Sequence, residues 1–188
     1  MSTTSMPFHD LNSYKISLVT AETALSPGRT YEPDVSSAAA LLRRIAADPG
    51  TWRSRVEFGG REDRWYSRLD LDLHHEIWLI SWLPGQSTGL HDHGAALGAF
   101  LVVEGTLTES TVQPASRVGG TVRTTSRQFT ASQVRGFGYE HIHDVANLDT
   151  VPAISLHAYS PELTAMTQYV LDDQRLRIVS SERAGVDW

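Results

Sequence analysis

Apolar and polar residues alternate along much of the chain after residue 60, and this alternation predicts short β-strands. In residues 65–73, Leu69, Leu71 and Leu73 fall on one face of an extended segment, and the charged residues fall on the other. The same alternation, with turn residues between the segments, predicts further strands and hairpins over 75–83, 99–109 with a break at Glu104-Gly105, 111–132, 153–159 and 169–179.

A single helix is predicted ahead of these strands, over residues 36–48. The segment is rich in alanine and leucine, Ser36 or Ser37 can cap its start, and Pro49-Gly50 ends it. One helix followed by many short strands favours a mainly β fold, a single jelly-roll barrel with a small helical N-terminal cap. We expect residues 1–60 to form the cap, as part of the same domain, and residues 61–188 to form the barrel.

Composition narrows the classes of function. The 188 residues are 40% hydrophobic and 20% charged, which is typical of one globular domain. A net charge of −6, with no cluster of Lys and Arg, argues against a nucleic-acid or anionic-membrane partner. The absence of cysteine excludes disulfides, thiolate zinc sites, iron–sulfur clusters and cysteine nucleophiles. With no secretion signal or membrane span in the pattern, we expect a cytoplasmic monomer.

His91 and His93 are the main candidates for a metal site. They stand two residues apart, so both imidazoles point to the same face of a strand. A third ligand is expected downstream, either His143 or His141. Three neutral imidazoles suit Fe(II), Zn, Cu or Ni alike, and they leave coordination positions open for other ligands. The alternative is that these histidines lie on a barrel surface and hold nothing.

Three polar residues, Ser155, His157 and Tyr159, alternate with apolar residues and so share one strand face. A buried polar group needs a partner, and a chain from hydroxyl to imidazole to phenol satisfies all three. Such a chain would fix the Tyr159 hydroxyl and its proton. The alternative is a satisfied core network with no catalytic task.

Arg68 lies on the same strand face as Tyr66, and we expect this face to point into the barrel interior. A guanidinium in that position needs an anion, and the carboxylate of a ligand is a natural bidentate partner. The alternative is a salt bridge to Asp70, Asp72 or Glu76.

The spacing of glycines and histidines resembles the first motif of the cupin superfamily, Gly-x5-His-x-His-x4-Glu-x6-Gly. The matching positions are Gly85, His91, His93 and Gly105, with Gly98 where the family usually has a glutamate ligand. The second cupin motif ends in His-x3-Asn, and His143 followed by Asn147 fits it. This spacing favours His143 over His141 as the third ligand, and the resemblance implies a cupin barrel.

Within the cupins, the chain resembles the bacterial cysteine dioxygenases. The resemblance spans residues 64–163 and is carried by Tyr66-Ser67-Arg68, by Trp-Leu-Pro-Gly-Gln at 82–86, by His-Asp-Val-Ala-Asn at 143–147 and by Ser-Leu-His-Ala-Tyr-Ser-Pro at 155–161. The last segment is the most specific. Gly98 stands where animal members carry a cysteine cross-linked to the motif tyrosine, here Tyr159, so this chain cannot form that cross-link.

The resemblance implies an Fe(II)-dependent thiol dioxygenase that converts L-cysteine and O2 to cysteine sulfinate. The residues it assigns are His91, His93 and His143 for the iron, Arg68 and Tyr66 for the substrate carboxylate, and Tyr159, held by His157 and Ser155, for a hydrogen bond to the substrate or the oxygen. Rival interpretations are a dioxygenase for 3-mercaptopropionate or cysteamine, a non-catalytic cupin that binds a metal or ligand, and a cupin isomerase or decarboxylase that uses Mn or Ni. Members that prefer 3-mercaptopropionate have a glutamine in place of Arg68.

Overall fold

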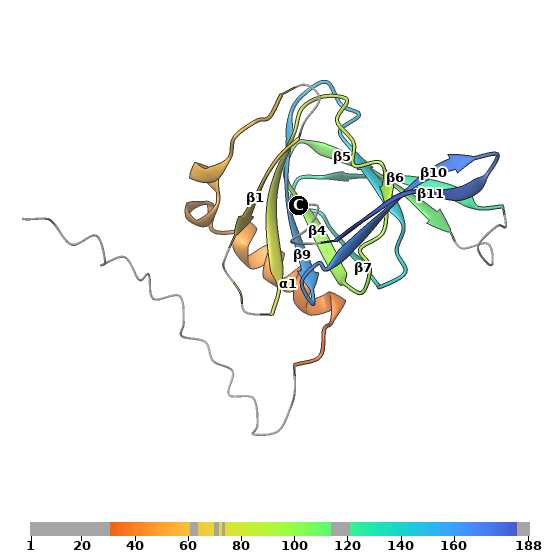
Figure 1. Ribbon diagram of the computed structural model, residues 1–188. Helices are drawn as coiled ribbons and strands as arrows, with labels where there is room; N and C mark the ends of the chain where they lie inside the picture. The colour runs from red at the N-terminus through yellow and green to blue at the C-terminus, as the bar shows by residue number, and fades with distance from the viewer. Residues whose placement is uncertain (1–30, 61–63, 70–71, 73, 114–120, 184–188) are drawn as a thin grey trace, which may run out of the picture. The chain divides into compact units, whose positions relative to one another are not determined.

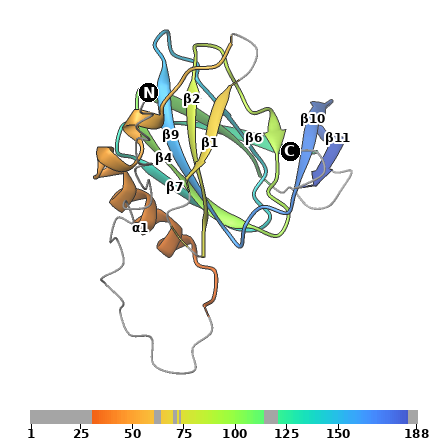
Figure 2. The ribbon, with the colours of Figure 1, turned by 60° about the vertical axis from the view of Figure 1, so that its left-hand side comes forward.

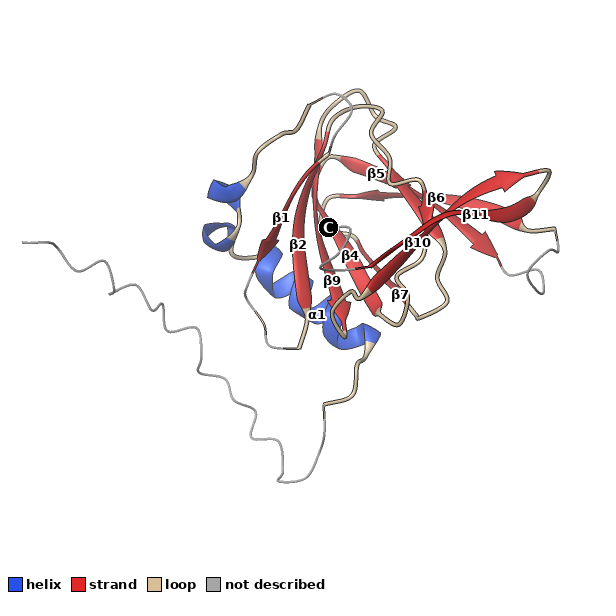
Figure 3. Cartoon of the chain, in the orientation of Figure 1, coloured by secondary structure: helices blue, strands red, loops and turns tan. Residues whose placement is uncertain are grey.

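Two antiparallel sheets make up most of the structure, a computed structural model that describes residues 31–60, 64–69, 72, 74–113 and 121–183 (Figures 1 and 3). The strands are β1 (Trp65–Leu69), β2 (Glu76–Trp82), β3 (Leu90–His91), β4 (Leu97–Glu104), β5 (Thr106–Gln113), β6 (Arg123–Thr130), β7 (Val134–Phe137), β8 (His143–Ala146), β9 (Ala153–Ser160), β10 (Ala165–Asp172) and β11 (Arg175–Arg183). One sheet has the order β1-β2-β9-β4-β7, and the other has the order β11-β10-β3-β8-β5-β6. The predicted mainly β jelly-roll fold is confirmed.

Most of the predicted strands are present with shifted ends. The segment 99–109 forms parts of β4 and β5, separated as predicted at Gly105, which has a φ of +78°. The segment 169–179 lies in the β10–β11 hairpin, whose turn residues Asp173 and Gln174 have φ values of +46° and +61°. The Ser160–Pro161 peptide bond, which follows β9, is cis.

The predicted helix is α1 (Val35–Ala46), but its cap differs from the prediction. Asp34, rather than Ser36 or Ser37, is the N-cap, because its carboxylate accepts a hydrogen bond from the Ser37 backbone N–H over 3.1 Å. Two short 3-10 helices follow, Pro49–Thr51 and Arg53–Arg55. Residues 1–30 of the predicted cap lie outside the described residues, and the boundary at residue 60 stays a prediction. No helix in the described part of the chain is long and apolar enough to cross a membrane.

The apolar core has two layers, one on each face of the five-stranded sheet. The outer layer is formed where α1 packs against β4, β7 and β9, as Figure 2 shows from the side of the helix. Leu42 of α1, Leu101 of β4 and Leu156 of β9 belong to this layer. The inner layer, inside the barrel, includes Phe100 and Tyr159.

Strand β9 lies between these layers, and all eight of its residues are buried. Because side chains alternate along a strand, Leu156 and Ala158 enter the outer layer. Ser155, His157 and Tyr159 therefore face the barrel interior, as the alternation predicts.

Candidate metal centre

Three histidines from separate segments meet inside the barrel. His91 ends β3, His93 follows in the next turn, and His143 begins β8, directly opposite His91 in the β3–β8 ladder. One ring nitrogen from each lies within 4.8 Å of the others, and all three residues are at most 4% exposed. His141 lies outside this group, because its Nε2 atom makes a hydrogen bond to Glu109 over 2.8 Å. The structure thus brings together the three histidines that the cupin spacing favours.

Hydrogen bonds behind two of these rings fix which nitrogen faces the centre. His91 Nδ1 lies 2.9 Å from the Gly89 carbonyl oxygen, and His143 Nδ1 lies 2.9 Å from Glu109 Oε1. A carbonyl or carboxylate oxygen accepts, so both Nδ1 atoms carry the proton and both Nε2 atoms keep a lone pair for a metal.

His93 supplies the test of whether a metal fits. Both of its ring nitrogens are buried, and neither has a hydrogen-bond partner in the described part of the chain. Buried polar atoms are rarely left unpaired. A metal ion held with His91 and His143 would supply a partner for one of these two nitrogens, so the donor set fits a metal.

The charge states also suit metal binding. Burial lowers the pKa of His91 to about 3, and it lowers the pKa values of His93 and His143 as well, so all three rings are neutral near pH 7. Burial alone would raise the pKa of Glu109, but hydrogen bonds from His141 and His143 outweigh it and hold this pKa far below its ordinary value. A carboxylate behind a ligating histidine orients the ring and increases its basicity.

Position 98, where cupins usually carry a glutamate ligand, has no room for a side chain. A Cβ atom built on Gly98 would lie 2.4 Å from the Ala158 carbonyl oxygen and 2.9 Å from Cζ of Phe137. Phe137 occupies this space and stacks on the His93 ring, with 4.7 Å between ring centroids. The centre therefore has three imidazoles and no carboxylate from this position.

A hydrogen-bonded chain runs along the inner face of β9. Ser155 Oγ lies 2.8 Å from His157 Nε2, and His157 Nδ1 lies 3.5 Å from the Tyr159 hydroxyl. Trp82 Nε1 donates to Ser155 Oγ over 2.8 Å, a contact that the sequence reasoning missed. Alternation along β2 places Trp82 on the same face as Trp78 and Ile80, and this was the available signal.

The Trp82 contact sets the direction of the whole chain. An indole N–H only donates, so the Ser155 hydroxyl accepts from Trp82 and gives its own proton to His157 Nε2. Burial keeps His157 neutral by lowering its pKa, so its single ring proton is on Nδ1 and points at the Tyr159 oxygen. The proton of Tyr159 is left for another acceptor, and burial raises the pKa of this phenol above its ordinary value.

His91, His143 and Tyr159 border one cavity of about 210 Å³. Its walls are formed by Arg64, Tyr66, Trp78, Ile80, Thr88, His91, His143, Val145, His157, Tyr159, Leu163, Met166, Gln168 and Glu182. A cavity of this size is large enough for a small organic ligand beside the metal site.

The structure differs from the prediction for Arg68. The side chain of Arg68 is 48% exposed, it does not border the cavity, and its Nη2 atom lies 3.3 Å from Glu162 Oε2. Arg68 does share its strand face with Tyr66, which borders the cavity but is 55% exposed. The reason is that β1 is the edge strand of its sheet, so side chains on its inner face reach the solvent at the rim. Among the described residues Glu162 is an ion-pair partner of Arg68, and Asp70, one of the three acidic residues expected, lies outside the described residues.

Arg64 is the arginine that borders the cavity. Its guanidinium lies over the Trp82 ring at 5.0 Å, and its Nη1 atom is buried without a hydrogen-bond partner among the described residues. Burial lowers the pKa of Arg64. The sequence reasoning missed this residue. Residues 64, 66 and 68 are two apart, so the alternation that predicted Arg68 places all three on one face of an extended segment.

Comparison with solved structures supports the fold. A structure of oxalate oxidase in complex with a substrate analogue, glycolate, is 16% identical with a TM-score of 0.50, covering 78% of this chain and 73% of that chain. A recombinant oxalate oxidase in complex with glycolate is also 16% identical with a TM-score of 0.50, covering 60% of this chain and 59% of that one. A cupin 2 conserved barrel domain protein from Salinispora arenicola CNS-205 is 17% identical with a TM-score of 0.42, covering 56% and 82%. At 16% identity the likeness to the two oxalate oxidase structures concerns the fold alone.

The family comparison goes further than the fold. The family model for cysteine dioxygenase type I matches residues 28–173. The matched segment contains all three clustered histidines and the inward-facing polar chain of β9, and it ends before β11 begins. The chain therefore belongs to the cysteine dioxygenase type I family.

Proposed function

We propose that this protein is an iron-dependent thiol dioxygenase that oxidises L-cysteine with O2 to cysteine sulfinate. The observation that carries the proposal is that His91 and His143 border the same cavity as Tyr159 in a chain of the cysteine dioxygenase family. Both oxygen atoms of O2 join the sulfur, and the sulfur supplies all the electrons that O2 takes up. The reaction therefore needs no other reductant and ends at the sulfinic level of cysteine oxidation.

The chain offers iron a set of neutral nitrogen donors. Nε2 of His91, Nε2 of His143 and one ring nitrogen of His93 would hold it, and iron would supply the redox chemistry that joins thiol and O2. The buried, neutral rings need no deprotonation before they bind, because their pKa values lie below the ordinary value for histidine. The same donors suit zinc, copper or nickel, so activity has to be compared between different metals.

Tyr159 is proposed to donate a hydrogen bond into the cavity. His157 Nδ1–H points at the phenol oxygen, which leaves the phenol proton directed away from His157. Because burial raises the pKa of Tyr159, the group stays a neutral donor across the physiological range. A donor fixed in this way orients the substrate or O2 beside the metal site without a conformational cost at the moment of reaction.

Arg64 is proposed to bind the substrate carboxylate, the task that the family resemblance gives to Arg68. A buried guanidinium nitrogen without a partner is costly, and a carboxylate in the cavity would pair with it. Arg68 already has an anion, Glu162, at the rim.

The test is O2 uptake and sulfinate formation by protein loaded with Fe(II) or with Zn(II), with L-cysteine, cysteamine and 3-mercaptopropionate as substrates. We expect sulfinate from cysteine with iron and none with zinc. Arg64→Gln should raise KM for cysteine by roughly tenfold or more, as expected for loss of a charge-assisted pair, whereas Arg68→Gln should change it little. The reverse ranking would return the role to Arg68, which would then have to leave Glu162 and turn inward. If none of the three thiols gives sulfinate, the dioxygenase proposal is wrong, and a non-catalytic cupin that binds a metal or ligand becomes the better interpretation.

A further inference from the structure

One buried carboxylate close to the cavity belongs neither to the metal centre nor to the hydrogen-bonded chain of β9. Glu76, the first residue of β2, is 4% exposed and pairs in register with Tyr159. It forms no ion pair within the described part of the chain. A buried carboxylate without a cation is costly, so Glu76 depends on the hydrogen bonds that it accepts.

Both oxygens of Glu76 accept a hydrogen bond, and both donors come from residues of the cavity wall. The Trp78 indole N–H donates to Oε1 over 2.6 Å, and the Leu163 backbone N–H donates to Oε2 over 2.8 Å. Trp78 and Leu163 border the cavity, whereas Glu76 does not. The carboxylate therefore joins two parts of the wall without being part of it.

These two parts of the wall come from segments that are far apart in the chain. Trp78 lies in β2, where alternation places it on the same face as Glu76, and Leu163 lies in the connection between β9 and β10. A second bond joins the same segments, because Ser160 Oγ donates to the His74 carbonyl oxygen over 2.9 Å. The bonds of Glu76 are the ones that reach the wall, and they fix the β9–β10 connection relative to the Trp78 indole.

The chemistry of the two donors calls for a carboxylate at position 76. An indole N–H and a backbone N–H can only donate, so both bonds need an acceptor oxygen. A glutamine would turn an NH2 group towards one of these donors. Trp78 also packs edge-on against Tyr66, another wall residue, with 5.6 Å between the ring centroids. Holding the indole in place therefore orders more of the wall than Trp78 alone.

We propose that Glu76 is a positioning residue for ligand binding, whose carboxylate holds the Trp78 indole and the Leu163 connection in the arrangement that the thiol substrate meets. This inference rests on the proposed function, since it concerns the wall of the cavity in which the thiol binds. A wall that is ordered in advance loses little freedom when a ligand arrives, so it binds the ligand more tightly. Glu76 acts through Trp78 and Leu163 and makes no contact with the thiol.

Two substitutions separate the hydrogen bonds of Glu76 from its charge. Burial raises the pKa of Tyr159, and the charge of Glu76 raises it further, so the charge alone could influence the cavity. Glu76→Gln removes the charge and one acceptor oxygen. Glu76→Asp keeps the charge on a side chain that is one methylene shorter and cannot keep both bonds. A positioning role predicts that both variants are impaired.

Equilibrium binding measures this role without turnover. L-Cysteine is titrated into Fe(II)-loaded protein under anaerobic conditions, and Kd is measured by calorimetry. Both Glu76 variants should bind cysteine about 3–10-fold more weakly, as expected when one large side chain has to be ordered on binding. In a Trp78→Phe background, Glu76→Asp should weaken cysteine binding less, because one of the two donors is already gone.

The indole N–H of Trp78 gives a second measurement that needs no ligand. In the NMR spectrum of Zn(II)-loaded protein, the indole resonance that disappears in Trp78→Phe belongs to Trp78. This resonance should shift in both Glu76 variants, because its N–H loses a charged acceptor or the distance that the bond requires. A purely structural loss of stability would lower Tm without moving this one resonance.

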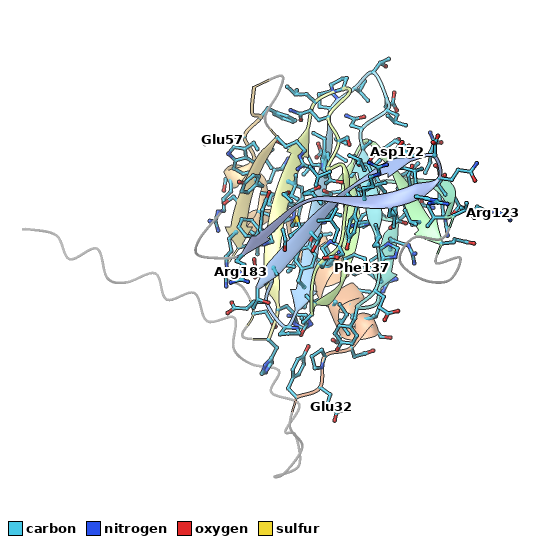
Figure 4. All side chains as sticks on the ribbon, turned by 45° about the vertical axis from the view of Figure 1, so that its right-hand side comes forward. Glu32, Glu57, Arg123, Phe137, Asp172 and Arg183 are labelled. Atoms are coloured by element: carbon cyan, nitrogen blue, oxygen red, sulfur yellow. The ribbon has the colours of Figure 1, made fainter. Side chains whose placement is uncertain are left out.

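Glu57→Gln and Glu57→Asp are the matched controls, because Glu57 is an exposed loop residue outside the cavity wall (Figure 4). They should change neither Kd nor the Trp78 resonance. Weaker binding by Glu76→Gln alone would assign the effect to charge and overturn the inference. An unchanged Kd in both Glu76 variants, an equal change in the Glu57 controls, or no binding of cysteine by the wild type would overturn it as well.

Failure of the positioning role and failure of the proposed function give different results. If both Glu76 variants bind cysteine more weakly as expected but the wild type forms no sulfinate, the dioxygenase proposal is wrong and the role of Glu76 stands. If the wild type forms sulfinate and both variants bind cysteine as tightly as it does, the dioxygenase proposal stands and the role of Glu76 is wrong.

Discussion

The Glu109 carboxylate accepts the Nδ1 proton of His143 over 2.9 Å, behind the face of the ring that looks into the metal centre. The same oxygen also accepts from His141 Nε2 over 2.8 Å, and Arg135 Nε donates to the other oxygen over 2.9 Å. Three donors thus hold one nearly buried carboxylate. Glu109 fixes the tautomer and orientation of His143 without being one of the clustered donors around His93.

Replacing Glu109 tests this positioning role. In Glu109→Gln the amide keeps one acceptor oxygen and gains a donor, so it cannot accept from all three neighbours. We expect metal affinity to fall roughly 10–100-fold, measured by competition with a chelator for Zn(II) on initially metal-free protein. Glu140→Gln, an exposed acid in the turn before His141, is the control. Equal affinity in the two variants would show that His143 needs no carboxylate to orient it.

Crowding at position 98 gives a prediction about stability. A Cβ on Gly98 meets the backbone oxygen of Ala158 at 2.4 Å, and a backbone atom cannot rotate away as a flexible side chain can. Gly98→Ala should therefore destabilise the protein by about 1–3 kcal/mol, seen as a lower Tm. Gly138→Ala is a matched control, because nothing lies within 4 Å of its Cβ position. A variant at position 98 with the wild-type Tm would mean that the strands β4 and β9 can separate at little cost.

The alternation of side chains located the candidate site only in part. It placed Ser155, His157 and Tyr159 on one inward face, because β9 is central and the whole of that face is enclosed. It could not choose between Arg68 in β1 and Arg64 just before that strand, because both are even-numbered positions in the same alternation. That choice depends on β1 lying at the sheet edge, and the edge is set by pairing between distant segments.

The role of Glu109 was beyond the sequence pattern for the same reason. It meets His143 only because β5 pairs with β8, which places Thr111 opposite His143 and Glu109 opposite Val145. Glu182 likewise reaches the cavity through the β10–β11 register, a long-range consequence of the fold. Local motifs therefore identified the clustered histidines, whereas the residues behind and opposite them required the strand pairing.

Buried neutral histidines make the metal-free protein sensitive to acid. The pKa of His91 is about 3 in the folded state against an ordinary value of 6.5, so between these pH values the unfolded chain binds a proton that the folded chain does not. The free energy of unfolding should therefore fall as the pH falls from about 6.5 towards 3, by roughly 1.4 kcal/mol per pH unit for each such histidine. Burial lowers the pKa of His93 and of His157 in the same way.

Urea denaturation of metal-free protein at several pH values between 7.5 and 5 measures this slope. His157→Gln removes one buried imidazole that borders the cavity but is not among the three clustered histidines. It should reduce the slope of unfolding free energy against pH by the contribution of about one bound proton. A stability that does not change from pH 7 to pH 5 would show that these rings are already protonated in the folded protein.

Asp92, which stands between His91 and His93 in the chain, is tied to β10. Its Oδ2 atom accepts from the Tyr169 hydroxyl over 2.6 Å, and its Oδ1 atom accepts from the Gly94 backbone N–H over 3.0 Å. Burial and the hydrogen bond to Asp92 raise the pKa of Tyr169 to about 12, so the phenol stays a donor through the physiological range. The bond therefore anchors the turn that carries His93.

Tyr169→Phe removes this anchor and leaves the ring in place. A hydrogen bond to a charged group is among the stronger ones, and the turn it holds carries a ring with no hydrogen bonds of its own in the described structure. We therefore expect weaker metal binding, by about tenfold at most, with a change in Tm smaller than that of Gly98→Ala. The comparison is Tyr139→Phe, because Tyr139 is 49% exposed and lies outside the cavity wall. If metal affinity is the same in both tyrosine variants, the turn holds His93 without the Tyr169 bond, and the remaining bonds of Asp92 to the backbone of Gly94 and of Thr167 in β10 are sufficient.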